Sequence, residues 1–171
     1  MDELLIRKAQ NGDKESFSAA VMELKDRAYR IAYCYLHNRE DSMDAVCDAV
    51  EKAYRNIKKL NNAGLFSTWF IRIVINECKT HLRKYGRETV REEVMATAAA
   101  REKDEQAMDL EILLKELDTQ DRMLIYMKYY MGYTLTEISD LTGLPLWNIK
   151  SRIYGNLKKM KGKLQLGEVE V

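Results

Sequence analysis

The residues best suited to chemistry lie near the C-terminus, where basic side chains occur without acidic ones. The chain carries 28 Lys and Arg against 27 Asp and Glu, yet no Asp or Glu occurs from Leu141 to Gly167. The bases of this stretch are Lys150, Arg152, Lys158, Lys159, Lys161 and Lys163. Cationic groups with no carboxylate nearby are suited to binding phosphate. The stretch therefore predicts a surface that binds nucleic acid or an acidic protein.

Two helices joined by a glycine turn would position these bases. Thr134 and Glu137 have the spacing of a capping box, which starts a helix of about eight residues. Gly143 can adopt the left-handed conformation that ends this helix, and Pro145 suits the first turn of the next one. This order of signals is typical of a helix-turn-helix.

The second of these helices has an apolar face and a polar face. The apolar residues recur at helical spacing and should pack on the domain core: Ile149, Ile153, Leu157 and Met160. The opposite face combines hydrogen-bonding groups with cations, as a helix in the major groove of DNA needs. The residues predicted to contact DNA are Trp147, Asn148, Lys150, Ser151, Arg152, Tyr154 and Lys158. A solvated basic face, or one that docks on an acidic protein, is the alternative interpretation.

Acidic residues form a stripe in the N-terminal half of the chain. Its members, separated by three, four and three positions, are Asp41, Asp44, Asp48 and Glu51. This spacing places four like charges on one face of a predicted helix, where they repel one another. A helix keeps such a stripe at little cost only where the acids are solvated or meet a basic partner. The spacing alone leaves both interpretations open.

A polar and basic stripe lies on the next predicted helix. Its members, separated by four, three and four positions, are Arg72, Asn76, Lys79 and Arg83. The helix is headed by Trp69 and preceded by the small polar loop NNAGLFST, residues 61–68. Aromatic rings stack on unpaired bases while cations follow the backbone, so this region is suited to single-stranded nucleic acid. The alternative for Trp69 is a position at least partly in the core.

The elements that carry these residues are all expected to be helices. A long helix over Lys14–Leu36 has the inward face Phe17, Val21, Leu24, Ala28, Ile31 and Tyr35. A second begins after HNRE, with Val46, Val50, Ala53 and Ile57 predicted to face inward. A third runs from about Thr68 to Lys84 and supplies the core residues Trp69, Phe70, Ile73, Val74 and Leu82.

The helical periodicity is interrupted once. From Tyr85 to Gln106 the chain is rich in charge and alanine and poor in large apolar residues, which is typical of a linker. Apolar spacing resumes at Leu110. The sequence therefore predicts an all-α protein with two small helical domains, 1–84 and 108–171, joined by a flexible linker over 85–107. The C-terminal domain is predicted to be the helix-turn-helix.

The composition excludes several classes of site. The three cysteines, Cys34, Cys47 and Cys78, form no CxxC pair and have only two histidines to accompany them, so neither a metal site nor a disulfide framework is expected. We expect buried free thiols in a reducing compartment. No catalytic constellation, cofactor site or small-molecule substrate site is predicted. The N-terminus lacks the apolar core of a signal peptide, so we expect a cytoplasmic protein that is not embedded in a membrane.

Three strings, in order and at this spacing, resemble the extracytoplasmic-function (ECF) class of bacterial RNA polymerase sigma factors. REDSMDAVCDAVEKAYRNI is similar to the family's acid-rich helix. FSTWFIRIVINECKTHLRK is similar to its Phe-x-x-Trp pattern continuing to an Ile and an Asn, here Ile73 and Asn76. YYMGYTLTEISDLTGLPLWNIKSRI is similar to its helix-turn-helix. The resemblance covers nearly the whole chain.

The resemblance implies partners and contact residues. RNA polymerase core, through its β′ clamp helices and β subunit, would bind Asp41, Asp44, Cys47, Asp48 and Glu51. The promoter -10 element would be recognised and melted by Asn61, Asn62, Ser67, Thr68, Trp69, Arg72, Asn76, Lys79 and Arg83. The helix after Gly143 would read the -35 element. An anti-sigma factor that holds the chain inactive, in some cases near the membrane, is also implied, as is association with the nucleoid when polymerase is bound.

The sequence departs from the family at three places. Trp147 and Asn148 stand where a small Gly-Thr pair is common, Met43 and Cys47 where Glu and Gln often occur, and Asp118 where a Pro usually opens a helix. Asp118 is suited to act as the N-cap instead. One alternative function is a dimeric helix-turn-helix repressor with an N-terminal effector or interaction domain, and another is an adaptor that binds only proteins. Neither accounts for the acid stripe and residues 61–83 together.

Overall fold

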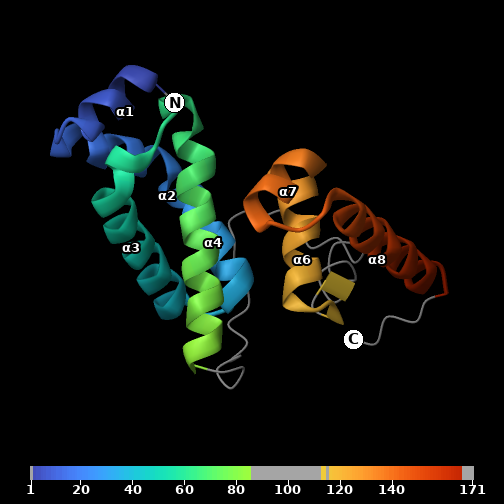
Figure 1. Ribbon diagram of the computed structural model, residues 1–171. Helices are drawn as coiled ribbons and strands as arrows, with labels where there is room; N and C mark the ends of the chain where they lie inside the picture. The colour runs from blue at the N-terminus through green and yellow to red at the C-terminus, as the bar shows by residue number, and fades with distance from the viewer. Residues whose placement is uncertain (1, 86–112, 115, 167–171) are drawn as a thin grey trace, which may run out of the picture. The chain divides into compact units, whose positions relative to one another are not determined.

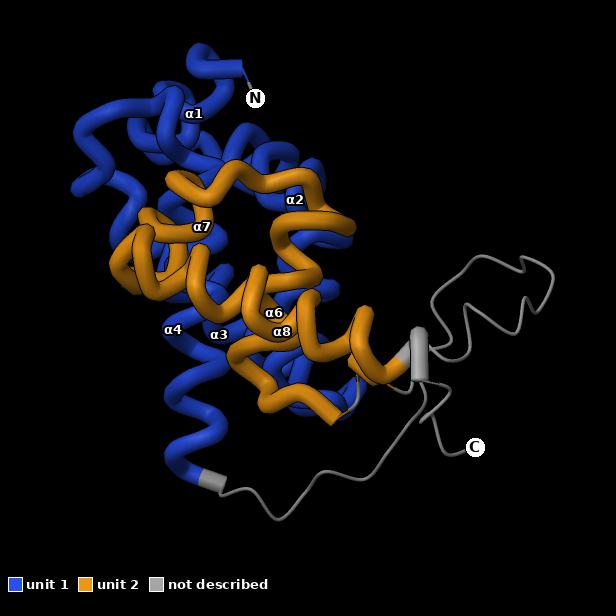
Figure 2. Tube along the Cα trace, turned by 90° about the vertical axis from the view of Figure 1, so that its right-hand side faces the viewer, with its two compact units in different colours: residues 1–93 blue, residues 94–171 orange. Residues whose placement is uncertain are grey.

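The computed structural model describes residues 2–85, 113–114 and 116–166, and these contain helices, turns and loops but no β-strand. The chain divides into two compact units, residues 1–93 and 94–171 (Figure 2). The predicted all-α class with two helical domains is therefore confirmed. Apart from Tyr85, the predicted linker over 85–107 lies outside the described residues.

In the first unit, residues 2–85 form four α-helices and two short 3-10 turns. The elements are α1 (Glu3–Gln10), α2 (Lys14–Leu36), α3 (Arg39–Asn56), η1 (Ile57–Lys59), η2 (Ala63–Leu65) and α4 (Phe66–Tyr85). Asp2, Asp13 and Asn38 each accept a hydrogen bond from a backbone N–H in the first turn, which is why the first three helices begin where they do. The helix predicted over Lys14–Leu36 and its six inward residues are confirmed.

Helix α3 packs against both α2 and α4, and Figure 1 shows α3 and α4 side by side. The predicted inward face of α3 was partly wrong, because Val46 and Val50 are only half-buried. Its buried residues are Ser42, Ala45, Ala49 and Ala53. Small side chains let the backbone of α3 approach two neighbouring helices closely, which a row of valines would prevent. Ala53 and the following Ile57 are buried as predicted.

Helix α4 starts two residues before the predicted position and buries a different face from the expected one. Phe70 and Val74 are buried as predicted, whereas Trp69, Ile73 and Leu82 are half-buried. The remaining core residues of this helix are Phe66, Ile71, Ile75 and Cys78. Because α4 contacts both α2 and α3, its apolar face is wider than the single stripe expected from the sequence.

The described part of the second unit contains α6 (Thr119–Ile125), the π-helical turn η4 (Tyr126–Tyr130), α7 (Leu135–Thr142) and α8 (Leu146–Leu166). Asp118 accepts a hydrogen bond from the Asp121 N–H and is the N-cap of α6, as predicted. The core contains Met123, Leu124, Met127, Ile138, Ile149 and Ile153. Of the predicted inward residues on α8, Leu157 is half-buried and the other three are buried.

The helix-turn-helix signals are confirmed one by one. Thr134 and Glu137 form the reciprocal capping box, with the Thr134 N–H donating to the Glu137 carboxylate at 2.8 Å. Gly143 ends α7 with φ of 75°, a left-handed conformation that glycine adopts without steric cost. The Pro145 carbonyl accepts the first hydrogen bonds of α8, from the backbone N–H groups of Asn148 and Ile149. The turn at Gly143 therefore separates α7 from α8, which begins at Leu146.

Candidate functional site

The acid stripe lies on the solvent side of α3. Asp44, Asp48 and Glu51 are exposed and Asp41 is half-buried. Two of these acids have partners within the unit, since His81 Nε2 lies 3.4 Å from the Asp48 carboxylate and Glu51 pairs with Arg55 on the same helix. Both carboxylates stay accessible in these pairs, with 57% of the Asp48 side chain and 61% of the Glu51 side chain exposed.

Two uncharged side chains lie among these acids. Met43 is 50% exposed and Cys47 is exposed. The expectation of buried thiols is thus wrong for Cys47 and correct for Cys34 and Cys78. Methionine is enriched at protein interfaces and is costly to leave in water, so this face is suited to a protein partner with basic groups.

The loop between α3 and α4 exposes the predicted amides. Asn61 and Asn62 are exposed, while Leu60 and Ala63 on either side of them are buried. The Asn62 Oδ1 accepts from the Gly64 N–H at 3.0 Å, so this amide also shapes the loop. Leu65 is exposed next to them, which sequence reasoning missed because a leucine there resembles core.

The first turns of α4 continue this surface. Ser67, Thr68 and Trp69 are half-buried. The Trp69 ring packs against Phe66 with centroids 5.9 Å apart, so the interpretation of Trp69 as partly core is correct. Further along the basic stripe, Arg72, Asn76 and Arg83 are exposed and Lys79 is half-buried. The basic stripe on α4 thus follows the exposed loop directly along the chain.

Helix α8 exposes most of the residues predicted to contact DNA. Trp147 is 72% exposed and Tyr154 is 52% exposed, and Lys150, Ser151 and Lys158 are exposed as well. Asn148 is half-buried, and its buried Oδ1 has no hydrogen-bond partner. Two large aromatic rings and several cations are thus exposed along one helix, a combination suited to a nucleic-acid or protein partner.

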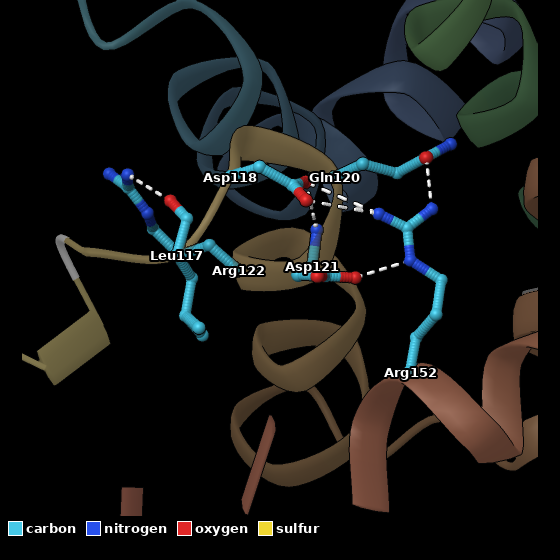
Figure 3. A network of polar contacts seen from close by, with 6 residues as sticks. All are labelled: Leu117, Asp118, Gln120, Asp121, Arg122 and Arg152. Atoms are coloured by element: carbon cyan, nitrogen blue, oxygen red, sulfur yellow. Dashed lines mark hydrogen bonds and ion pairs between the residues drawn. The ribbon is translucent and has the colours of Figure 1, made fainter. Parts of the chain in front are cut away.

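Arg152 has a different environment from its neighbours on α8. Its guanidinium donates to the carboxylate of Asp121, to Oε1 of Gln120 and, at 3.3 Å, to both carboxylate oxygens of Asp118 (Figure 3). Only 26% of the Arg152 side chain is exposed. The structure thus holds the Arg152 guanidinium against the start of α6, and its contact with DNA stays a prediction.

The same network lowers the pKa of Asp118. Partial burial alone would raise this pKa, but the Asp121 N–H and the Arg152 guanidinium both stabilise the carboxylate, and the net shift is downward. In the first unit, burial raises the pKa of the Cys78 thiol to about 12. Cys78 is therefore a packing residue of the core and is protected from reaction.

One contact in the first unit has no local signal in the sequence. The side-chain amide of Gln10 in α1 donates to the backbone carbonyls of Ile57 and Leu60, at the start of the exposed loop. These partners lie 47 and 50 positions away along the chain, so only the tertiary structure reveals the contact.

Within the described part of the chain, no group of His, Cys, Asp and Glu residues is placed to hold a metal ion. No described helix is long and apolar enough to cross a membrane.

Comparison with known proteins identifies both units. The sequence matches the family model Sigma-70 region 2 over residues 20–88 and Sigma-70, region 4, over residues 107–160. RNA polymerase sigma factor SigV of Bacillus subtilis is 24% identical over 159 residues, covering 92% of this chain and 96% of the relative. The ECF RNA polymerase sigma-E factor of Haemophilus influenzae is 25% identical over 187 residues, covering 96% of this chain and 95% of the relative.

Two solved structures are similar in fold. CnrH in complex with the cytosolic domain of CnrY has a TM-score of 0.70 and 21% identity, covering 96% of this chain and 97% of that one. The sigma factor RpoE from Bartonella quintana, in complex with the anti-sigma factor NepR, has a TM-score of 0.67 and 19% identity, covering 88% of this chain and 98% of that one.

Proposed function

The chain belongs to the extracytoplasmic-function class of RNA polymerase sigma factors, and we propose that it directs core polymerase to promoters through three separate surfaces. One surface binds polymerase, one recognises and melts the -10 element, and one reads the -35 element. The observation that carries this proposal is the division of charge, with an exposed acidic helix face in one unit and an acid-free exposed helix in the other.

The polymerase-binding surface is the acid stripe of α3 with the uncharged residues inside it. Asp44, Cys47, Asp48 and Glu51 are exposed there and Asp41 lies at its edge. A basic partner, which the family's β′ clamp helices supply, relieves the mutual repulsion of these acids. The exposed Met43 adds apolar area that such a contact would remove from water.

The -10 surface is the loop before α4 together with the exposed side of α4. Asn61 and Asn62 offer hydrogen bonds to the edge of an unpaired base, and Leu65 offers apolar contact beside them. Arg72, Asn76, Lys79 and Arg83 follow the phosphate backbone of the opened strand. Ser67, Thr68 and the exposed part of Trp69 connect the two groups.

The -35 surface is the outward side of α8. Trp147, Ser151 and Tyr154 meet base edges in the major groove, while Lys150 and Lys158 contact phosphate. Asn148 lies beside this surface and is half-buried, and its side chain would have to turn outward before its amide could contact DNA. Arg152 is left out of this surface because its guanidinium is bound to α6.

Two further features of the family extend to this chain as proposals. Both structural neighbours are complexes, one with the cytosolic domain of CnrY and one with the anti-sigma factor NepR, so we infer that an anti-sigma partner controls this chain as well. We further propose that this chain acts in the cytoplasm and is associated with the nucleoid when it is bound to polymerase. An anti-sigma partner should suppress transcription when it is added to a reconstituted reaction. A variant of this chain that does not bind the partner should direct transcription as before in its presence.

In vitro transcription tests the main proposal. The purified chain is added to bacterial core polymerase and a library of upstream DNA fragments, and transcripts are mapped. We expect transcripts only from fragments that share two unlike elements at a fixed spacing. A chain that yields no promoter-dependent transcript from any fragment, or that binds a palindrome tightly without polymerase, would contradict the proposal and favour the repressor.

A further inference from the structure

Helix α1 lies before the residues matched by the region 2 family model, which begin at residue 20. It packs onto the unit through Ile6 and Ala9, both of which are buried. It also contacts η1 and η2, the two turns that bracket the exposed loop. The helix therefore supports the loop proposed to capture the -10 element.

The contact is specific at one side chain. Gln10 Nε2 donates to the Leu60 carbonyl at 2.7 Å and to the Ile57 carbonyl at 3.1 Å. A glutamine amide nitrogen carries two N–H groups, so both are used on one turn of backbone. The Ile57 carbonyl also accepts from the Leu60 N–H at 3.1 Å, which closes that turn.

This turn fixes where the exposed amides begin. Leu60 directly precedes Asn61 and Asn62, and its side chain is buried. Beyond the amides, the chain is held again by the buried Ala63 and Phe66. The amides thus stand between two anchored points, and the carbonyl of the first point is held by a side chain from α1.

A second contact from α1 reaches the far end of the loop. A Cβ atom built on Gly64 would lie 2.9 Å from Glu3 Oε1, so the Glu3 carboxylate lies directly over Gly64. The two ends of the same short helix therefore meet the two ends of the same loop. Exposed loops are costly to order when they bind, and holding one in its bound shape beforehand removes part of that cost.

We propose that Gln10 is a positioning residue for -10 recognition, because its amide holds the backbone of residues 57–60 in the shape from which Asn61 and Asn62 meet an unpaired base. This inference rests on the proposed function of the loop. It predicts that the donor groups of Gln10 matter, and that its size and polarity alone do not.

Three substitutions separate these possibilities. Gln10→Met keeps the length of the side chain and removes the donors, and Gln10→Glu keeps the shape but places a carboxylate against two carbonyls. Gln10→Lys restores N–H donors on a different group. Ser18→Met, at an exposed site on α2, is the control for adding methionine to the surface of this unit.

Hydrogen exchange in the free chain gives the first readout. Amides of residues 57–65 should exchange faster in the Met and Glu variants, while those of α2 and α4 stay as in the wild type and in Ser18→Met. The Lys variant should resemble the wild type. Unchanged exchange in both the Met and Glu variants would show that Gln10 does not hold the loop and would overturn the inference.

Binding by the holoenzyme gives the second readout. The probe is a single-stranded oligonucleotide of the non-template -10 sequence, taken from a promoter mapped by in vitro transcription. We expect about 10-fold weaker binding of the oligonucleotide by the Met and Glu variants, because each loses one or two hydrogen bonds to the loop. Their affinity for core polymerase should be unchanged. The Lys variant should bind within about twofold of the wild type.

The failures of the two proposals are distinguishable. A wild-type holoenzyme that initiates at no promoter contradicts the proposed function, and the role of Gln10 in recognition falls with it. A wild type that initiates and binds the oligonucleotide, with Met and Glu variants that bind it equally well, contradicts only the inference. Equal loss in all three variants, the lysine included, would also overturn it.

Discussion

The guanidinium of Arg152, in the second turn of α8, donates to the carboxylate of Asp121 at the start of α6. The two residues lie 31 positions apart, and 26% and 15% of their side chains are exposed. Asp118 and Gln120 complete the set of acceptors around the same guanidinium. This contact joins the helix proposed to read DNA to the N-terminus of α6, and so sets how α8 is held on its domain.

Replacing Arg152 should therefore act on the domain and leave base preference alone. Arg152→Ala leaves Asp121 half-buried without its cation, and we expect a loss of about 1 to 3 kcal/mol in the free energy of unfolding of the second unit. Urea denaturation followed by the amide signals of α6 to α8 measures it. Binding should weaken for all -35 sequences alike, and a changed order of preference among them would contradict a positioning role.

Replacing Trp147 should instead change which -35 sequences are preferred. Because it is exposed where base edges are proposed to be met, Trp147→Ala should change the ranking of -35 sequences and leave the unfolding free energy of the unit within about 0.5 kcal/mol. Selection from a randomised -35 library with holoenzyme measures the ranking. Lys158→Ala is the matched control on the same helix.

The control should weaken every promoter alike. A lysine that contacts phosphate carries no base information, so its loss should reduce the slope of log affinity against log salt by about one. A library ranking that is unaltered by Trp147→Ala, or altered equally by Lys158→Ala, would contradict the division between the two residues.

Reversing charge on α3 should release polymerase. Asp44→Lys with Asp48→Lys places two cations on the exposed acid stripe, and we expect at least about 10-fold weaker binding to core polymerase. Glu23→Lys with Asp26→Lys makes the same charge change on exposed positions of α2 and should bind core as the wild type does. Equal affinities of the two double variants, measured by fluorescence titration with core, would contradict the assignment of this stripe.

Cys47 offers a direct footprint of the same face. It is exposed within the acid stripe, whereas Cys34 and Cys78 are buried and burial raises the pKa of Cys78 to about 12. Iodoacetamide should therefore modify Cys47 alone in the folded chain, as read by mass spectrometry of its peptides. Binding of core polymerase should protect it. Modification at the same rate in the free chain and in the holoenzyme would exclude Cys47 from the interface.

Acid should weaken the second unit in part through Asp118. Its pKa is lower in the folded chain than in the unfolded one, so its contribution is present above about pH 4 and is lost as the pH falls through the folded value. Asp118→Asn keeps an N-cap but cannot titrate, so its melting temperature should fall less between about pH 5 and pH 2. Parallel acid titrations of wild type and variant would contradict this linkage.

Most of the helices of this protein could be predicted from the sequence because their signals are local. The capping box of Thr134 and Glu137 joins residues three positions apart, and Gly143 needs no neighbour to adopt its left-handed conformation. The predicted inward face of α2 was correct because its apolar residues recur with the same helical spacing along the whole helix. The acid stripe, the polar loop and the exposed side of α8 were visible in the sequence for the same reason.

The errors arose where one helix meets two others. The buried face of α3 follows its alanines, and α4 buries Ile71, Ile75 and Cys78, because each helix contacts two neighbours whose positions no single period encodes. Cys47 was expected to be buried on composition alone, whereas its exposure depends on which side of α3 the neighbours cover.

The sequence by itself determined most of the helices, the capping signals of the helix-turn-helix, the two-domain organisation and the family, since these depend on residues a few positions apart and on strings read in order. Only the tertiary structure shows which groups Arg152 and Gln10 contact. Their partners lie 31 and 47 to 50 positions away, and a long polar side chain reads the same in a sequence whether it meets DNA, solvent or its own fold. Packing of the helices brings the partners within hydrogen-bonding distance, and the roles proposed for both residues follow from these contacts.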